Sequence, residues 1–274
     1  MENNKDIDDA SSDLLNNSNM STQASAGPQT HRPSSPVPYA ELMKRDQSSE
    51  LAPPDFSSGP VPSGLATDHA PVSRSRPHLL KYACELTLDP NTAHRELSLH
   101  EGKKVVLVYE TYAYEKKQTH PEHPERFDHE YQVLCREGLS GRCYWEAEWK
   151  GSEKRAHMAY IAVAYRSIQR KGKGDDVTMG RNTKSWSLFC TPFSYSFEHN
   201  RKRTDIPAPS SGSSRVGVYL DWPAGTLSFY SVSADTLTHL HTFRSTFTEP
   251  LCPGFRLYYP PAGTYSSVSL CQIT

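Results

Sequence analysis

The stretch CYWEAEW at residues 143–149 decides the fold class of this chain. Every second residue from Cys143 to Trp149 is apolar, whereas Glu146 and Glu148 lie between them. An alternation with a period of two residues puts the apolar side chains on one side of an extended backbone and the acidic side chains on the other. The stretch therefore predicts a β-strand with one buried face.

The same alternation recurs along the second part of the chain. It is found in RVGVYL (215–220), TLSFY (226–230) and SSVSLCQI (266–273), while MAYIAVAY (158–165) predicts a more fully buried strand. The connection DWPAG (221–225) contains a glycine and has the length of a β-hairpin turn. No stretch shows long helical periodicity. Many short strands without crossover helices predict an all-β fold, a two-sheet antiparallel β-sandwich.

The first 78 residues have a different composition. They hold ten of the 21 prolines, no Trp and no Cys, and their only aromatic residues are Tyr39 and Phe56. Such a segment cannot bury enough apolar surface to offset the entropy lost on folding. We therefore predict a disordered Pro- and Ser-rich tail over residues 1–78, with a net charge of −4, and a folded domain over residues 79–274, with a net charge of +3.

Charge and hydropathy exclude several classes of function. The chain has 274 residues and a formal net charge of −1, which argues against a dedicated nucleic-acid binder. Its longest apolar run, residues 158–165, is less than half of the ~18 residues that a membrane span needs, and its first residues are polar. We therefore expect no nucleic acid, no membrane insertion, no secretory signal and a cytoplasmic location.

Motifs for metal binding and catalysis are weak or missing. The six cysteines are irregularly spaced and form no CxxC pair, so we expect free thiols in a reducing compartment. His120, His123 and His129 lie close to Glu122 and Asp128, which leaves a metal site open, although a solvated loop is favoured. The sequence contains no GxSxG, phosphate-loop or dinucleotide motif. We expect no enzymatic activity, no metal and no cofactor.

Six ordered blocks carry a resemblance to a known family. They are LDPNTA (88–93), HPERF (123–127), SGRCYWEAEW (140–149), NTKSWSL (182–188), RVGVYLDW with GTLSFY (215–230) and FTEPLCPGF (247–255). With these blocks the chain resembles the PRY/SPRY family over essentially all of residues 79–274. The PRY part would cover about 79–135 and the SPRY part about 136–274. The sequence is most similar to the fish versions in NLR-type and TRIM-type immune proteins and in stonustoxin-like proteins.

The resemblance implies a non-catalytic module that binds a partner protein, with a role in innate immune signalling. We expect this domain to be monomeric. One alternative is an adaptor, or a piece of a larger NLR-type or TRIM-type protein, in which the tail carries a regulatory motif around Tyr39–Ser49. Another is a stonustoxin-like assembly subunit that acts on membranes, which is disfavoured because the sequence shows no amphipathic pore-forming stretch.

Sandwich-end loops are the expected location of a binding surface, because loops vary without disturbing packed strands. Tyr and Arg are enriched in binding hot spots. The hypothesis is an aromatic floor with cations that orient the partner; its residues are Tyr112, Tyr114, Tyr258, Tyr259 and Tyr265 for the floor and Arg166, Arg170 and Lys171 for the cations. The alternative, that these are ordinary loop residues packed on their own neighbours, stays open.

Overall fold

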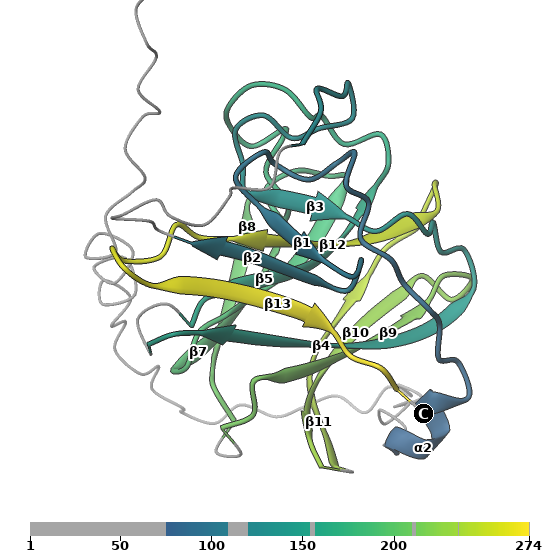
Figure 1. Cartoon of the computed structure of the whole chain (residues 1–274). Helices are drawn as coiled ribbons and strands as arrows, with labels where there is room; N and C mark the ends of the chain where they lie inside the picture. The colour runs from purple at the N-terminus through teal and green to yellow at the C-terminus, as the bar shows by residue number, and fades with distance from the viewer. Residues whose placement is uncertain (1–74, 109–119, 154–156, 210–211, 235, 274) are drawn as a thin grey trace, which may run out of the picture. The chain divides into compact units, whose positions relative to one another are not determined.

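A computed structural model describes residues 75–108, 120–153, 157–209, 212–234 and 236–273. Within these residues, two antiparallel sheets lie face to face, which confirms the predicted sandwich (Figure 1). The predicted tail as far as residue 74, including the Tyr39–Ser49 patch, lies outside the described residues.

The larger sheet has seven strands in the order β1-β2-β13-β4-β9-β10-β11. Their bounds are Ser98–His100 (β1), Lys104–Val108 (β2), Tyr265–Leu270 (β13), Arg142–Gly151 (β4), Arg215–Asp221 (β9), Thr226–Ser233 (β10) and Thr236–Arg244 (β11). The smaller sheet has six strands in the order β3-β12-β5-β6-β7-β8. Their bounds are Gln132–Leu134 (β3), Leu251–Leu257 (β12), Ala159–Tyr165 (β5), Ser185–Cys190 (β6), Ser194–His199 (β7) and Lys202–Pro207 (β8).

The main core lies between the sheets and follows the alternation in the sequence. In β4, Trp145, Ala147 and Trp149 are buried in this core, as the repeat of two predicts. The turn between β9 and β10 also forms where it was predicted, because Asp221 pairs with Thr226. Gly225 has a φ of +65°, and a side chain there would meet the carbonyl oxygen of Ser245, so this turn requires glycine.

A short helix, α2 (Arg76–Leu80), packs on the outer face of the seven-stranded sheet. Leu79 is fully buried there with Tyr144, Tyr219 and Tyr230. The helix spans the expected boundary between residues 78 and 79, so residues 76–78 lie with the folded part. Because α2 covers β4, the outward-facing Glu146 is buried rather than solvated.

The outer face of the six-stranded sheet is partly covered by the connection between β5 and β6. Ile168 and Met179 from this connection pack with Ala162, Ala164 and Cys252, which point outward from the sheet. At Gly180 the chain has a φ of +89°, and a side chain would overlap the Ser187 hydroxyl. The connection therefore lies directly on β6, and its side chains border the remaining part of the sheet face.

Candidate binding surface on the six-stranded sheet

An aromatic group stands on the outer face of the six-stranded sheet, near the end of β12. Strand register places Arg256, Tyr160 and Phe189 side by side on β12, β5 and β6. The Tyr160 and Phe189 rings stack with their centroids 4.5 Å apart, and the Tyr258 ring lies 5.6 Å from Tyr160. The Arg256 guanidinium lies 4.6 Å from the Tyr160 ring centre and 5.0 Å from that of Tyr258. This is a cation held between two aromatic rings.

The two tyrosine hydroxyls of this group contact each other. The Tyr160 and Tyr258 oxygens are 3.1 Å apart, so one hydroxyl donates to the other. Burial raises the pKa of Tyr160 well above its ordinary value of 10, which keeps this phenol neutral. Tyr160 is buried, whereas Tyr258 is only half-buried. Tyr258 is therefore the member of the pair that a partner can reach.

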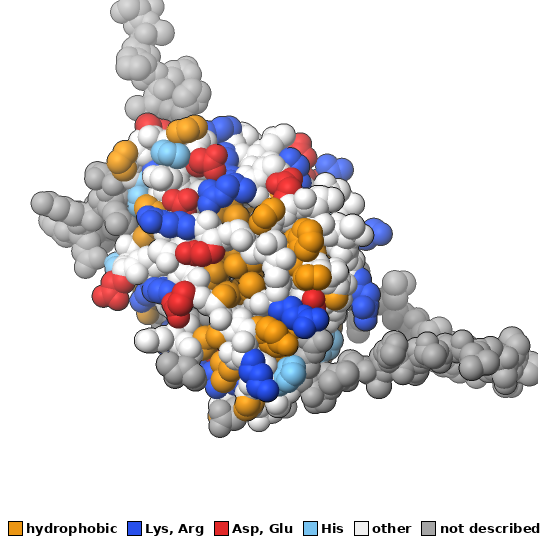
Figure 2. All heavy atoms as spheres, turned by 90° about the vertical axis from the view of Figure 1, so that its right-hand side faces the viewer, with side chains coloured by type: hydrophobic (Ala, Val, Ile, Leu, Met, Phe, Trp, Pro, Cys, Tyr) orange, Lys and Arg blue, Asp and Glu red, His pale blue; other side chains and the backbone are white. Residues whose placement is uncertain are grey.

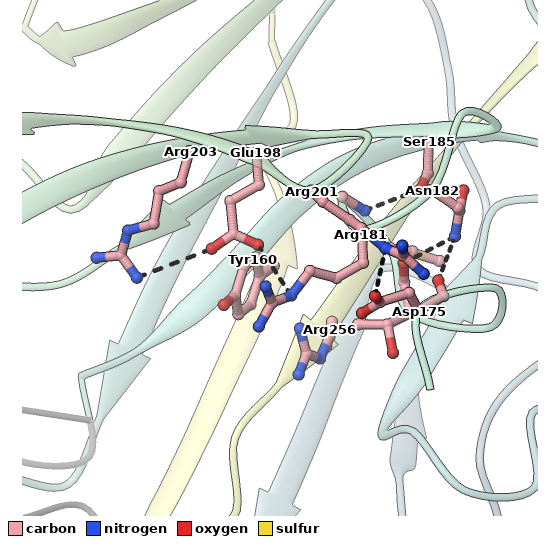
Figure 3. Close-up of polar contacts among 12 residues, drawn as sticks. Tyr160, Asp175, Arg181, Asn182, Ser185, Glu198, Arg201, Arg203 and Arg256 are labelled. Atoms are coloured by element: carbon pink, nitrogen blue, oxygen red, sulfur yellow. Dashed lines mark hydrogen bonds and ion pairs between the residues drawn. The ribbon is translucent and has the colours of Figure 1, made fainter. Parts of the chain in front are cut away.

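A carboxylate lies beside the aromatic group, between two arginines (Figure 3). Glu198 on β7 is opposite Ser187 on β6 and Arg203 on β8. Its oxygens are 3.9 Å from Arg181 Nε and 3.9 Å from Arg203 Nη1, which is close enough for an ion pair but too long for a hydrogen bond. The Glu198 side chain is 5% exposed, whereas that of Arg181 is 43% exposed.

Several buried polar atoms of this face have no hydrogen-bond partner among the described residues. They are Glu198 Oε2, Arg256 Nη1 and the hydroxyls of Ser187 and Ser196. Buried polar groups in folded proteins are nearly always hydrogen-bonded, to protein or to water. We call Tyr160, Arg181, Glu198, Arg256 and Tyr258 the Arg256 cluster. The members of this cluster that a partner can reach are Arg181 and Tyr258.

The backbone that carries Arg181 is held firmly (Figure 3). The Asn182 side chain donates to the carbonyl oxygens of Asp175 (2.8 Å) and Thr178 (2.9 Å). Its own oxygen accepts from the Ser185 hydroxyl at 2.8 Å. The Ser185 oxygen in turn accepts from the Gly180 amide at 2.8 Å. Asn182, inside the NTKSWSL block, therefore fixes the position from which Arg181 reaches Glu198.

The cations that were predicted to contact a partner, Arg166, Arg170 and Lys171, lie away from the Arg256 cluster, and Arg170 is buried. Arg170 is only 8% exposed; it donates to the Arg166 carbonyl at 2.8 Å and to Glu125 at 3.3 Å, and it lies over the Phe127 ring. Arg166 is 3.6 Å from both Asp89 and Glu125. These guanidiniums join the connection after β5 to the LDPNTA and HPERF segments. Protein groups therefore surround Arg170 in this structure, and its role in contacting a partner stays a prediction. Lys171 is exposed.

Tyr258, one of the predicted tyrosines, is at the opposite end of the six-stranded sheet from these cations. In the β5–β12 register, Tyr165 pairs with Leu251 and Ala159 with Leu257. Arg166 follows Tyr165, and Tyr258 follows Leu257, so about 20 Å of strand separates them. Tyr258 and Arg166 therefore do not share one surface, although they were expected to contact the same partner.

Tyr259 and Tyr265, two further predicted tyrosines, lie in different places. The Tyr259 ring lies 5.5 Å from that of Tyr131, next to the Arg256 cluster, and Tyr265 is exposed at the start of β13. Tyr112 and Tyr114 lie outside the described residues.

Four residues of the Arg256 cluster were missed in the sequence, namely Tyr160, Arg181, Glu198 and Arg256. Tyr160, Glu198 and Arg256 are large or charged residues at outward positions of otherwise buried strands, which is a signal that the sequence contains. Only the pairing of β12 with β5, of β5 with β6 and of β6 with β7 shows that these positions are neighbours.

The histidine-rich segment takes part in loop structure. His120 Nε2 is 2.6 Å from the Leu97 carbonyl oxygen, and His123 Nδ1 accepts from the Glu125 amide at 3.1 Å. Among the described residues, no group of three or more His, Cys, Asp or Glu side chains is placed to hold a metal ion. Nor does the described part of the chain contain a helix long and apolar enough to cross a membrane.

Two family models match this chain. The SPRY-associated domain PRY matches residues 86–139, and the SPRY domain matches residues 142–270. The chain belongs to the PRY/SPRY family. The division between the two matches falls a few residues after the predicted division at 135/136. SPRY domains are typically protein-interaction modules.

Relatives of this PRY/SPRY chain include both toxin subunits and tripartite-motif proteins. It is 45% identical over 183 residues to stonustoxin subunit beta of Synanceia horrida, covering 66% of this chain and 24% of that protein. It is 35% identical over 188 residues to tripartite motif-containing protein 16 of Mus musculus, covering 68% and 32%. The chain thus spans about a quarter to a third of the length of these relatives.

Solved structures show the same PRY/SPRY fold. The stonustoxin structure aligns with a TM-score of 0.64 at 39% identity, over 74% of this chain and 32% of that one. The TRIM65 PSpry domain aligns with a TM-score of 0.59 at 27% identity, over 78% of this chain and all of that one.

Proposed function

We propose that this chain is a non-catalytic protein-interaction module that binds a partner protein at the Arg256 cluster. The observation that carries the proposal is that two reachable side chains, Arg181 and Tyr258, border the ordered Arg256 cluster. A partner that packed on the Tyr258 ring and paired with the Arg181 guanidinium would gain contact with both.

The composition of the cluster also supports partner binding. Tyr and Arg carry a large share of the energy at protein interfaces, because each buries much area and keeps a polar end. Arg256 is held by the tyrosine rings and by Glu130, whose carboxylate lies 3.0 Å from its Nε. A preordered side chain loses little entropy when a partner binds.

The mixed charges of the cluster suit a protein partner better than a polyanion, because the Glu198 carboxylate lies between Arg181 and Arg203. Elsewhere on the domain, the face shown in Figure 2 has hydrophobic side chains near its centre and charged side chains of both signs around them. Mixed charges around apolar area are typical of protein interfaces. A role in innate immune signalling and a cytoplasmic location are part of this proposal, and the likeness to TRIM-type proteins supports them.

The test uses the full-length chain as bait in cytosolic extract, followed by affinity measurement with the partner that is recovered. We expect Tyr258→Ala and Arg181→Ala each to weaken binding by about tenfold, as hot-spot truncations do. Lys171→Ala, at the other end of the sheet, is the matched control and should leave the affinity within about twofold. Unchanged affinity in folded Tyr258→Ala and Arg181→Ala variants would refute the proposal.

A second candidate function places the regulatory element in the tail, with the sandwich as an anchor. The chain covers 24% and 32% of the length of two relatives, stonustoxin subunit beta and tripartite motif-containing protein 16. This favours a role as one part of a larger assembly. Tyr39→Ala in the full-length chain distinguishes the two functions. Loss of the partner in that variant, together with retention in Tyr258→Ala, would support the tail.

A further inference from the structure

Two half-buried cysteines, Cys84 and Cys143, flank the bridge at which the chain after α2 joins β4. Backbone hydrogen bonds connect the Tyr144 amide to the Tyr82 carbonyl (2.7 Å) and the Cys84 amide to the Tyr144 carbonyl (3.1 Å). Ala83 and Tyr144 form a parallel bridge. Residues 82–84 therefore run beside the start of β4 as a short extra strand.

The register of this bridge puts both thiols on the same side. Tyr144 belongs to the cluster under α2 on the outer face, so Cys143, one residue earlier, points to the inner side. Ala83 is level with Tyr144, so Cys84 also points to the inner side. Both cysteines pack at the edge of the main core, and Cys84 Sγ lies 3.6 Å from the Tyr144 carbonyl oxygen.

The two thiols also affect each other's acidity. Their interaction lowers the pKa of Cys143 and raises the pKa of Cys84. The lowered pKa favours the Cys143 thiolate, which is the form that reacts with oxidants. Cys84 supplies the second thiol at the same place.

The other described cysteines lack this combination. Cys135, Cys190 and Cys252 are buried. Cys271 is half-buried like the pair, but its sulfur lies 3.2 Å from Arg215 Nε, and burial raises its pKa. Cys271 thus serves as an internal control with similar exposure and no adjacent thiol.

We propose that Cys84 and Cys143 form an oxidation site, at which hydrogen peroxide or a related peroxide converts the two thiols into a disulfide. The Cys143 thiolate attacks one peroxide oxygen, the O–O bond breaks, and hydroxide leaves and is protonated to water. Cys143 is then a sulfenic acid. Cys84 loses its proton and attacks the Cys143 sulfur, and the hydroxyl group leaves as a second water. In sum, two thiols and one peroxide give one disulfide and two waters.

The disulfide would connect the segment after α2 covalently to β4. In the reduced protein that segment is held by the short bridge, by Leu79 and by the ion pair between Arg76 and Glu146. A covalent connection there would keep α2 on the seven-stranded sheet even when these contacts open. The oxidised protein should therefore resist proteolysis of the α2 segment for longer than the reduced protein.

The test treats the reduced full-length protein with hydrogen peroxide and maps tryptic peptides without reduction. Cleavage after Lys81, Arg95, Arg142 and Lys150 places the two cysteines in peptides 82–95 and 143–150, and Cys271 in a third peptide. We expect peptides 82–95 and 143–150 to be joined, with a loss of two hydrogens. The rate should rise with pH as Cys143 ionises.

Three variants make the outcome decisive. Cys271→Ser should leave the cross-link unchanged, whereas Cys84→Ser should stop oxidation of Cys143 at the sulfenic or sulfinic acid. Cys143→Ser should leave Cys84 unreacted. Unreacted Cys143 in the folded wild-type protein, or a cross-link that joins a different pair at equal yield, would overturn the proposal. So would an equal rate of proteolysis at α2 in the reduced and cross-linked protein.

Discussion

Arg76 in α2 donates two hydrogen bonds to Glu146 in β4, from Nε to Oε1 at 2.7 Å and from Nη2 to Oε2 at 3.2 Å. The Glu146 side chain is fully buried. It also accepts a hydrogen bond from the Tyr144 hydroxyl at 2.7 Å and lies 3.0 Å from Arg215. The helix therefore supplies one of two cations that allow a carboxylate to be buried on the outer face of the sheet.

Removal of this cation should destabilise the domain measurably. Arg76→Ala leaves Glu146 with Arg215 and Tyr144 only, and we expect a loss of about 1–3 kcal/mol in the free energy of unfolding, measured with urea. Arg142→Ala is the matched control. The Arg142 Nε lies 3.1 Å from Asp221 Oδ2, and the Arg142 side chain is 55% exposed. Because the Arg142 guanidinium is solvated, we expect Arg142→Ala to cost less than Arg76→Ala. Equal losses in the two variants would contradict the assigned role of Arg76.

His94 should make the domain sensitive to mild acid. Burial lowers the pKa of His94 from 6.5 to about 4, and its Nδ1 accepts a hydrogen bond from the Glu96 amide at 3.1 Å. Between pH 6.5 and 4 the unfolded chain binds a proton that the folded domain does not bind. Stability due to His94 is therefore complete above about pH 6.5 and falls as the pH drops to 4, by up to about 3 kcal/mol.

The contribution of His94 can be separated from that of other groups. Burial also lowers the pKa of His199, His239 and His241, so several histidines act in the same direction. Urea denaturation of the wild-type protein and of His94→Gln at a series of pH values isolates the one residue. We expect the variant to lose less stability than the wild type over this window. Parallel curves would count against a neutral, buried His94.

Strand β4 should not tolerate truncation of its core side chains. Trp145 is 2% exposed in the main core, and Trp145→Ala should cost about 3–5 kcal/mol and abolish soluble expression. The half-buried Trp222 in the β9–β10 turn offers the comparison, since Trp222→Ala removes a smaller buried area. Soluble yield and urea denaturation check both variants. A folded Trp145→Ala protein that only fails to bind its partner would contradict this assignment.

Gly180 should be required for the connection that carries Arg181. It combines a φ of +89° with the close approach of Ser187, so Gly180→Ala should cost about 1–3 kcal/mol and weaken partner binding through displacement of Arg181. Gly174 has a φ of +107° but open space where a side chain would begin, so Gly174→Ala introduces the backbone strain without the contact. A larger loss of stability for Gly180→Ala than for Gly174→Ala would confirm the contact, and equal losses would argue against it.

Local patterns in the sequence were sufficient for much of the scaffold. The period of two identified β4, and the glycine in DWPAG identified the turn between β9 and β10. The helix α2 was not predicted, because five residues are too short to show helical periodicity. Its stability comes from Leu79 and Arg76, whose contacts are with residues more than 60 positions away.

The sequence by itself therefore determined the two-sheet fold, the family and the core residues, since alternation reports which side of a strand is buried. Tertiary structure alone decided which charged residues are available to a partner. Arg170 and Arg181 lie in the same connection, yet Arg170 is buried against Glu125 and Phe127, while Arg181 reaches Glu198 and stays exposed. The difference depends on strand pairing and on what covers each face, and pairing brings together residues that no local pattern connects.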